Sequence, residues 1–283
     1  MGVATSDRLL RPATVAAAVA FREGNPGARL VGGGTLVVAE RSRGAGTPDA
    51  YILLSGIEDL RGVTSQGGVT RVGASTTLRE LHAADVAPIL DIAIRSLASP
   101  QIRNHATVGG NIAERRPDHT LTPCLIALNA TVEIAGTGGT VEVPIIDFLA
   151  RGVGPSELIT AVLIPPSSGF QKFVRVALRN GPGYAVASVA LAIDSSARTV
   201  RTGLGAVGPT PLAAPGADAF LTGAIDWSAG TVPAGTAEEY GRLLGDASDP
   251  VTDNRSSAEY RTHAIRVMGR RLVEDWTEET RNG

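Results

Sequence analysis

The chain has 283 residues, which is enough for two domains with hydrophobic cores of ordinary size. Hydrophobic residues make up 43% of it and charged residues 19%, a composition that excludes both a disordered chain and a bundle of membrane helices. The formal net charge of -2 offers no general attraction to nucleic acid or to anionic lipid, so we expect neither as a partner.

The chain contains one cysteine, Cys124, which cannot close an internal disulfide, hold a structural zinc alone or ligate an iron–sulfur cluster. The four histidines have no metal-ligand spacing, so no metal site is predicted. No secretory signal is visible at the N-terminus, and no apolar run reaches about 18 residues, the usual lower limit for a membrane span. These features predict a cytoplasmic protein without a membrane span.

The first half of the chain mixes short helices and strands. Residues 14–22 predict a helix, with Thr14 as its N-cap and Gly24 as its stop. A strand over residues 29–31 runs directly into three glycines, and Thr77 with Glu80 fits the capping box of a further helix. The other predicted elements of this half are strands 51–54, 62–65 and 69–73, a helix over 88–97, a polar loop over 99–111, a buried helix over 121–128 and a hairpin of strands 131–135 and 140–143.

The pattern changes near residue 165. Longer strands follow over residues 170–178, 187–194 and 200–207, then a loop rich in Ala, Gly and Pro over 208–217. Helices are predicted over residues 236–244 and 257–276. We therefore predict an α+β fold in two domains, residues 1–165 and 166–283.

The glycines that follow strand 29–31 can bend the main chain so that several N–H groups converge, which suits a phosphate oxygen. Thr35 adds a hydroxyl, a helix beginning at Leu36 adds the positive end of its dipole, and Arg29 adds charge. The alternative is a tight turn that uses glycine only for its conformation. The pattern is neither G-x-G-x-x-G nor a P-loop, so neither of those nucleotide sites is predicted.

A second glycine bend lies within residues 101–113 (QIRNHATVGGNIA). Gly109 and Gly110 allow close approach to a ligand, and Arg103, Asn104 and Asn111 are hydrogen-bonding residues beside them. Two such bends suggest a long ligand with phosphates at its centre. We expect their main-chain amides to converge on one diphosphate.

At these bends the sequence resembles the FAD-binding medium subunits of the molybdenum hydroxylases, a family that includes the carbon monoxide dehydrogenase flavoproteins and the flavin domain of xanthine dehydrogenase. Residues 31–36 resemble the family motif A-G-G-T-D/S-L, and residues 101–112 resemble Q-[IV]-R-N-x-[AG]-T-[IL]-G-G-N-[IL]. Residues 253–261 (DNRSSAEYR) resemble the start of the family's C-terminal helix. The resemblance covers nearly the whole chain.

The resemblance implies a two-part FAD-binding domain of the vanillyl-alcohol-oxidase (PCMH) type, followed by a smaller C-terminal domain of a sheet with helices. It places the pyrophosphate at residues 31–35 and the flavin side of the same cleft at residues 107–111. After the second bend the family reads S-P-x-x-D, whose Asp bonds the cofactor; here Thr120 takes that position, and Asp118 and His119 lie close enough to substitute. The residues expected to line a non-covalently bound FAD are Arg29, Val31, Gly32, Gly33, Gly34, Thr35, Leu36, Leu97, Ile102, Asn104, Thr107, Val108, Gly109, Gly110, Asn111, Asp118, His119, Thr120, Ile159 and Arg175.

The resemblance also implies a role in electron transfer. FAD would take electrons from an iron–sulfur small subunit and pass them to NAD, a quinone or oxygen, while a molybdopterin large subunit oxidises the substrate. Three alternatives remain open: a stand-alone flavoenzyme acting on a small metabolite, to which the altered segment 114–120 points; a scaffold that has lost FAD; and a relative of the cell-wall UDP-sugar reductases, which share a related FAD fold. No residue is assigned as catalytic.

Overall fold

The structure, a computed structural model, describes residues 8–44, 48–179 and 183–282, and it forms two compact units. The first unit contains Met1–Ala84, Ser99–Glu114 and Thr131–Ile164. The second contains Asp85–Ala98, Arg115–Ala130 and Pro165–Gly283. Two segments that precede residue 165 pack within the second unit. The two units therefore do not correspond to a division of the sequence at one position. The division into domains 1–165 and 166–283 stays a prediction.

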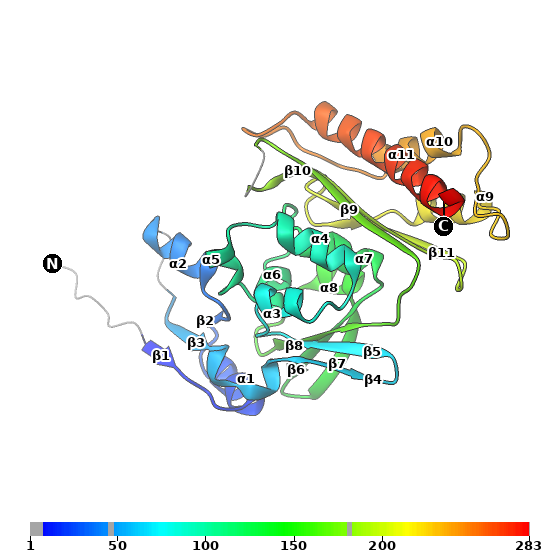
Figure 1. Cartoon of the computed structure of the whole chain (residues 1–283). Coiled ribbons are helices and arrows are strands. Elements are labelled where there is room, and N and C mark those ends of the chain that lie inside the picture. Colours follow the sequence, from blue (N-terminus) through cyan, green and yellow to red (C-terminus); the bar gives the residue numbers. More distant parts are fainter. Residues whose placement is uncertain (1–7, 45–47, 180–182, 283) are drawn as a thin grey trace. The chain divides into compact units, whose positions relative to one another are not determined.

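The first unit is built on two sheets that share one helix (Figure 1). A parallel sheet has the order β1-β3-β2, and an antiparallel sheet has the order β4-β5-β8-β6-β7. Helix α1 (Val15–Glu23) packs against both, because its buried Ala18 and Val19 share a core with Ile52 of β3, Ala135 of β6 and Leu158 of β8. The strands are β1 (Arg8–Leu10), β2 (Ala28–Val31), β3 (Ala50–Leu53), β4 (Val63–Gln66), β5 (Val69–Gly73), β6 (Thr131–Gly136), β7 (Gly139–Pro144) and β8 (Leu158–Ile164).

Local signals place the ends of the helices of this unit. The Thr14 hydroxyl accepts a hydrogen bond from the Ala17 N–H and Gly24 ends α1, while Thr77 and Glu80 form the predicted capping box. Both predicted caps are confirmed. The remaining helices are α2 (Thr35–Ser42), α3 (Leu78–Ala83), α5 (Pro100–Arg103), α6 (Val108–Ala113) and α8 (Ile145–Arg151), with 3-10 turns η1 (Leu54–Gly56) and η2 (Glu58–Leu60).

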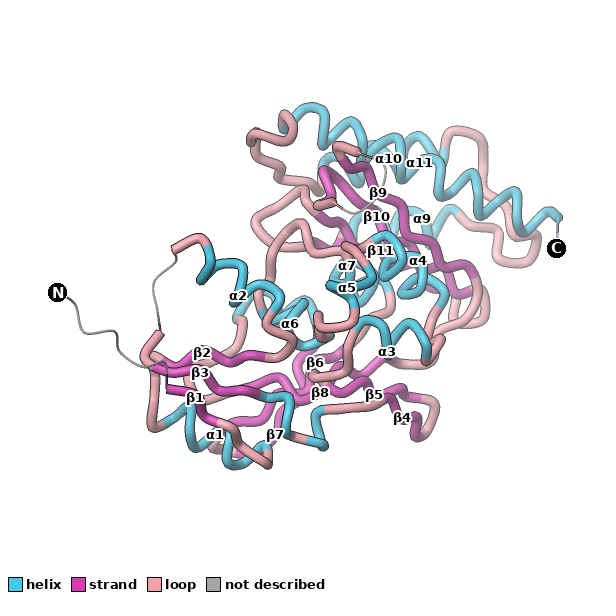
Figure 2. Tube along the Cα trace, turned by 60° about the vertical axis from the view of Figure 1, so that its left-hand side comes forward, coloured by secondary structure: helices cyan, strands magenta, loops and turns pink. Residues whose placement is uncertain are grey.

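The second unit is one antiparallel sheet with helices on both faces (Figures 1 and 2). Its strands follow the order β12-β11-β10-β9: β9 (Phe170–Ala177), β10 (Ala185–Asp194), β11 (Thr199–Gly205) and β12 (Leu212–Ala213). One face carries α9 (Pro215–Ala224), α10 (Thr236–Asp246) and α11 (Ala258–Asn282). The other face carries α4 (Pro88–Ser96) and α7 (Leu121–Ala127). Buried on both faces, β10 reads as the nearly continuous apolar run that such a position requires.

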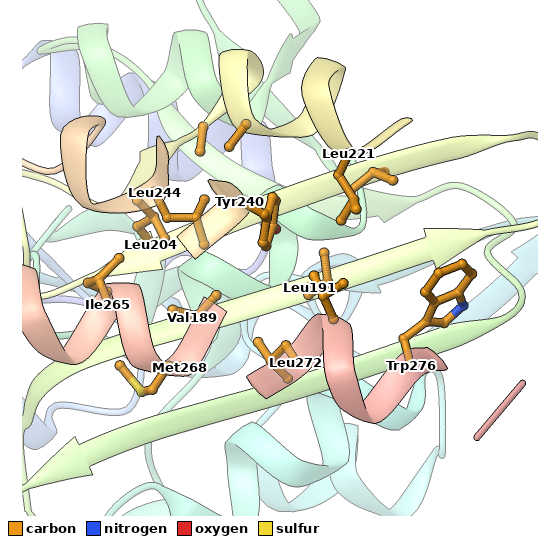
Figure 3. Packing of buried hydrophobic residues seen from close by; sticks show 14 of the residues in the cluster. Val189, Leu191, Leu204, Leu221, Tyr240, Leu244, Ile265, Met268, Leu272 and Trp276 are labelled. Carbon is orange, nitrogen blue, oxygen red and sulfur yellow. The ribbon is translucent and has the colours of Figure 1, made fainter. Parts of the chain in front are cut away.

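Alternation along the strands separates the two faces of this sheet. Val189 and Leu191 of β10 point to α11, where they meet Ile265, Leu272 and Trp276 (Figure 3). All five side chains are almost completely buried, and each of the four aliphatic ones contributes about 1.5–3 kcal/mol through removal of apolar surface from water. This cluster is the main core of the unit.

Two predicted loops were wrong in detail, and the central strand of the antiparallel sheet was missed. The loop expected over residues 99–111 contains α5 and most of α6, because Ser99 and Thr107 cap two short helices. The loop expected over residues 208–217 contains β12 and the start of α9. Strand β8 was not predicted, since its continuous apolar run lacks the alternation of a half-buried strand.

Candidate functional site

The first glycine bend connects β2 to α2. Val31 ends the strand beside Leu53, and Gly34 precedes the helix with a φ of 71°, a left-handed conformation that glycine adopts without strain. Within the part of the chain that the structure describes, no acceptor meets the N–H groups of Thr35, Leu36 or Val37 in the first turn of α2. Open amides at the positive end of a helix form a donor set for an anion.

The two glycine bends lie against each other. A Cβ added to Gly32 would come 2.6 Å from the Thr107 hydroxyl, and a Cβ on Gly33 would collide with the carbonyl oxygen of His105. The first bend can therefore approach the second only as glycine. The structure confirms the prediction that the two bends converge.

The second bend contributes shape rather than open amides. The N–H groups of Val108 and Gly109 donate to the carbonyls of Thr76 and Ala74 at 2.9 and 2.8 Å. The Gly110 N–H donates to the Thr107 hydroxyl at 3.2 Å, as in an N-cap, and the Asn111 N–H belongs to the first turn of α6. Four of the five amides of residues 107–111 are therefore already bonded within the protein, so the prediction that bare amides at both bends meet one diphosphate is not supported for these four. The glycine at position 109 is explained by close packing on Ala74.

A third segment, residues 74–78, completes the arrangement. Thr77 and Thr107 form an isolated antiparallel bridge, and the Leu78 N–H donates to the Ala106 carbonyl at 2.8 Å. Thr76 is fully buried, and its hydroxyl donates to the Gly62 carbonyl. Sequence reasoning saw only a helix cap in this segment. The run of small residues GASTT directly after a strand is the signal that it missed.

Arg29 lies beside the first bend, but its charge is largely offset. Its guanidinium contacts Glu40 at 2.5 Å and Glu114 at 3.1 Å, while its side chain is 34% exposed. Burial lowers the pKa of Arg29, and the bonds to the two carboxylates outweigh that effect and raise it. The Glu40 pair holds α2 against β2. Any ligand phosphate at the bend competes with these two carboxylates for Arg29.

Five of the predicted site residues belong to the second unit: Leu97, Asp118, His119, Thr120 and Arg175. The Asp118 carboxylate is buried and accepts hydrogen bonds from Arg116 at 3.1 and 3.2 Å and from Arg255 at 2.9 Å. Burial raises the pKa of Asp118, but the two guanidiniums outweigh burial and hold that pKa below its usual range. Asp118 is thus an anchor between two arginines.

Thr120 differs from Asp118, because no described group bonds its hydroxyl although the residue is 4% exposed. Arg175 donates from Nη1 to the Gly183 carbonyl at 2.6 Å, and burial lowers its pKa. In the first unit, Ile159 is buried within β8, whereas Ile102 and Asn104 are exposed near the second bend. Within the described ranges no group of three or more His, Cys, Asp or Glu side chains could hold a metal ion. No helix among the described residues combines the length and apolar composition needed to cross a bilayer.

These residues fit a bound FAD in one respect that the structure shows directly. The first bend offers three open amides at a helix N-terminus, directly after Gly32 and Gly33, where a Cβ would collide with the second bend. A diphosphate matches that donor set in charge and in the small size of the oxygen atoms that must approach the main chain.

Comparison with known proteins gives two family matches that together cover most of the chain. The family described as "FAD binding domain in molybdopterin dehydrogenase" matches residues 5–167, and "CO dehydrogenase flavoprotein C-terminal domain" matches residues 172–276. The carbon monoxide dehydrogenase medium chain of Afipia carboxidovorans is 33% identical over 93% of this chain and 94% of its own length. A putative xanthine dehydrogenase FAD-binding subunit of Escherichia coli is 28% identical over 94% of each chain.

A solved structure of carbon monoxide dehydrogenase from Oligotropha carboxidovorans contains a chain that matches the whole fold. It superposes with a TM-score of 0.87 at 28% identity, over 98% of this chain and 99% of the other. The two-domain α+β prediction is confirmed by this match and by the family matches. The predicted cofactor, non-covalently bound FAD, is likewise confirmed.

Proposed function

This chain belongs to the family of FAD-binding medium subunits of the molybdenum hydroxylases, and from that premise we propose that it carries electrons between an iron–sulfur partner and a final acceptor. It is an FAD-containing oxidoreductase subunit, in which FAD supplies the redox chemistry when bound. The protein's own contribution is to bind, orient and shield the cofactor. We propose that the protein functions in the cytoplasm.

The first glycine bend is the observation that carries the proposal. The open N–H groups of Thr35, Leu36 and Val37, which lie beside Gly33 and Gly34, support a pyrophosphate site at residues 31–35. The second bend packs against it through Thr107 and His105, which supports a role for residues 107–111 in shaping the same cleft. Arg29 adds a positive charge beside the bend and so favours phosphate binding, although its ion pairs with Glu40 and Glu114 reduce this effect.

The other predicted cofactor residues rest on the resemblance. Leu97, Ile102, Asn104 and Ile159 are proposed neighbours of the cofactor, as is Arg175. Among the three residues that replace the family's Asp, the local chemistry favours Thr120, because both carboxylate oxygens of Asp118 are already bonded to arginines. His119 stays a candidate. A variant in which Asp118, His119 and Thr120 are all replaced should bind FAD more weakly or shift its potential; unchanged values would remove this segment from the proposal.

The electron route requires other chains. One cysteine cannot ligate an iron–sulfur cluster, so a relay of that kind must belong to a partner, and we propose an iron–sulfur small subunit together with a molybdopterin large subunit. Several relatives bear names that describe subunits of larger assemblies, such as the nicotine 6-hydroxylase medium subunit of Paenarthrobacter nicotinovorans. Purification of the tagged chain from its native cell should recover two such chains.

The alternative is a stand-alone flavoenzyme that oxidises a small metabolite. The departure of segment 114–120 from the family motif suggests this alternative. The structure gives this reading little support, because the Asp118 carboxylate has a lowered pKa and is committed to Arg116 and Arg255. A general base would need a carboxylate open to substrate.

One experiment separates the two functions. The isolated FAD-loaded chain is mixed anaerobically with candidate substrates, and the flavin absorbance is followed before and after the partner chains are added. Under the proposal, bleaching requires the partners. Bleaching of the isolated chain by a substrate would establish the stand-alone enzyme instead, and a chain that takes up no FAD would remove both.

A further inference from the structure

A hollow of about 190 Å³ lies in the second unit, on the face of the sheet that carries α7. It is bounded by the end of α7 at residues 127–129, by residues 165–167 and by side chains of β10 and β11. All of these segments belong to the second unit. None of the residues predicted to bind FAD lines it.

The hollow exists because a small residue lies between two long ones. In the register of the sheet, Ala192 of β10 pairs with Gln171 of β9 on one side and with Arg201 of β11 on the other. Paired residues share a face, so these three side chains form one row across the sheet. The methyl group of Ala192 leaves a gap beneath the end of α7.

Opposite charges lie on two sides of this gap without pairing directly with each other. Asp194 and Arg201 are diagonal neighbours on adjacent strands, a spacing of about 7–8 Å between their backbones. Arg201 donates from Nη1 to the Thr199 hydroxyl at 3.0 Å, and no described acceptor meets its other guanidinium N–H groups. The Thr199 oxygen accepts that bond, so its own proton is free to donate. One wall therefore presents donors to an anionic group.

The other wall is negative. Asp194 accepts hydrogen bonds from the Ala197 N–H at 2.8 Å, from the Ser196 N–H and from the Ser168 N–H and hydroxyl; these bonds lower its pKa, so it is ionised at neutral pH and contributes its charge rather than open lone pairs. Leu128, Pro165 and Ala192 supply an apolar surface between the two walls.

We propose that this hollow binds a small zwitterion, an aliphatic α-amino acid, with its carboxylate on Arg201 and its ammonium group at Asp194. The donor wall suits the carboxylate, the negative wall suits the ammonium group, and the apolar surface suits a short branched side chain. The volume fits a molecule of this size. The site is separate from the FAD-binding residues, and its occupation does not depend on electron transfer.

The test is calorimetric titration of the FAD-loaded protein with L-valine as the probe. Two matched probes dissect the charges: isovalerate lacks the ammonium group, and isobutylamine lacks the carboxylate. We expect saturable binding of L-valine only, with affinity for either half-molecule lower by at least about tenfold. Equal binding of isovalerate and L-valine would overturn the zwitterion assignment, and no saturable heat with L-valine would overturn the site.

Variants locate the binding within the fold. Arg201→Gln should weaken L-valine binding at least about tenfold, because it removes the charged donor. The matched control is Arg198→Gln, which removes an exposed arginine from the adjacent turn and does not line the hollow. Ala192→Leu fills the gap and should abolish binding. Full-affinity binding in Ala192→Leu, or equal loss in both arginine variants, would place the ligand elsewhere.

Discussion

The pH dependence of stability should depend on one buried carboxyl group, Asp218 of α9. Thr202 of β11 donates to it from its N–H at 3.2 Å and from its hydroxyl at 2.5 Å, and the same hydroxyl contacts the Tyr240 phenol of α10 at 2.6 Å. Burial raises the pKa of Asp218 to about 7, against the bonds from Thr202 and the weaker attraction of Arg201, which lower it. The charge of Asp218, after burial, raises the pKa of Tyr240 as well.

The sign follows from the two pKa values. The folded pKa of Asp218 lies above its unfolded value of 3.8, so its stabilising effect is complete below about pH 4 and is lost as the pH rises to about 7. The full difference corresponds to about 4 kcal/mol, of which about 3 kcal/mol falls between pH 5 and pH 8. Asp218→Asn cannot ionise, so it removes this loss, although it also gives up one acceptor for Thr202.

The measurement is urea unfolding of the wild type and of Asp218→Asn at pH 5 and pH 8. Tryptophan fluorescence reports on the second unit alone, because the chain has two tryptophans, Trp227 and Trp276, and both lie there. The free energy of unfolding of the wild type relative to the variant should fall by about 3 kcal/mol between the two pH values. The control is Glu238→Gln, which also removes one carboxylate charge but from an exposed position on α10. The wild type relative to this control should show no such fall. A pH-independent difference for Asp218→Asn would refute the buried ionisation.

Three further predictions test the packing of each unit. Gly33→Ala places a Cβ against the carbonyl oxygen of His105, so FAD affinity measured by flavin titration should fall at least about tenfold; wild-type affinity would show that the bends can separate freely. Thr77→Ala loses the capping box with Glu80 and should lower the free energy of urea unfolding by about 1 kcal/mol, a cost that Thr77→Ser should largely avoid. Arg261→Met leaves two main-chain carbonyls without donors and should cost about 3–5 kcal/mol, read from tryptophan fluorescence; a loss under 1 kcal/mol would show that water replaces the guanidinium.

Sequence patterns predicted most of the fold where local chemistry decides the structure. Thr14, Thr77 and Gly24 end or begin helices because their own side chains or conformations meet the orphan groups of a helix end. The β4–β5 and β6–β7 hairpins followed from glycine turns between alternating strands. Such signals act over a few residues and need no knowledge of the rest of the chain.

The features that were missed depend on contacts between distant segments. Strand β8 is central in its sheet, with β5 on one side and β6 on the other, so its apolar run carried no strand period. Thr107 caps the helix at the second glycine bend, and the carbonyls of residues 74 and 76, far away in the chain, accept two of its first amides. A sequence motif could show that Gly109 must be small, but not whether a ligand or Ala74 requires it.

The residues of the C-terminal motif, 253–261, are explained by contacts within the protein rather than by a ligand. Asp253 accepts bonds from the N–H groups of Arg255 and Ser256, which fixes the turn before α11. Arg261, almost fully buried, donates to Asp253 at 2.7 Å and to the main-chain carbonyls of Val186 and Ala206 at 2.8 Å. The motif therefore fastens α11 to β10 and to the chain after β11. Of the three motifs that carry the family resemblance, the first bend presents consecutive open main-chain donors at a helix start, whereas most amides of residues 107–111 are bonded within the protein. We therefore expect changes in the C-terminal motif to alter stability before they alter FAD affinity.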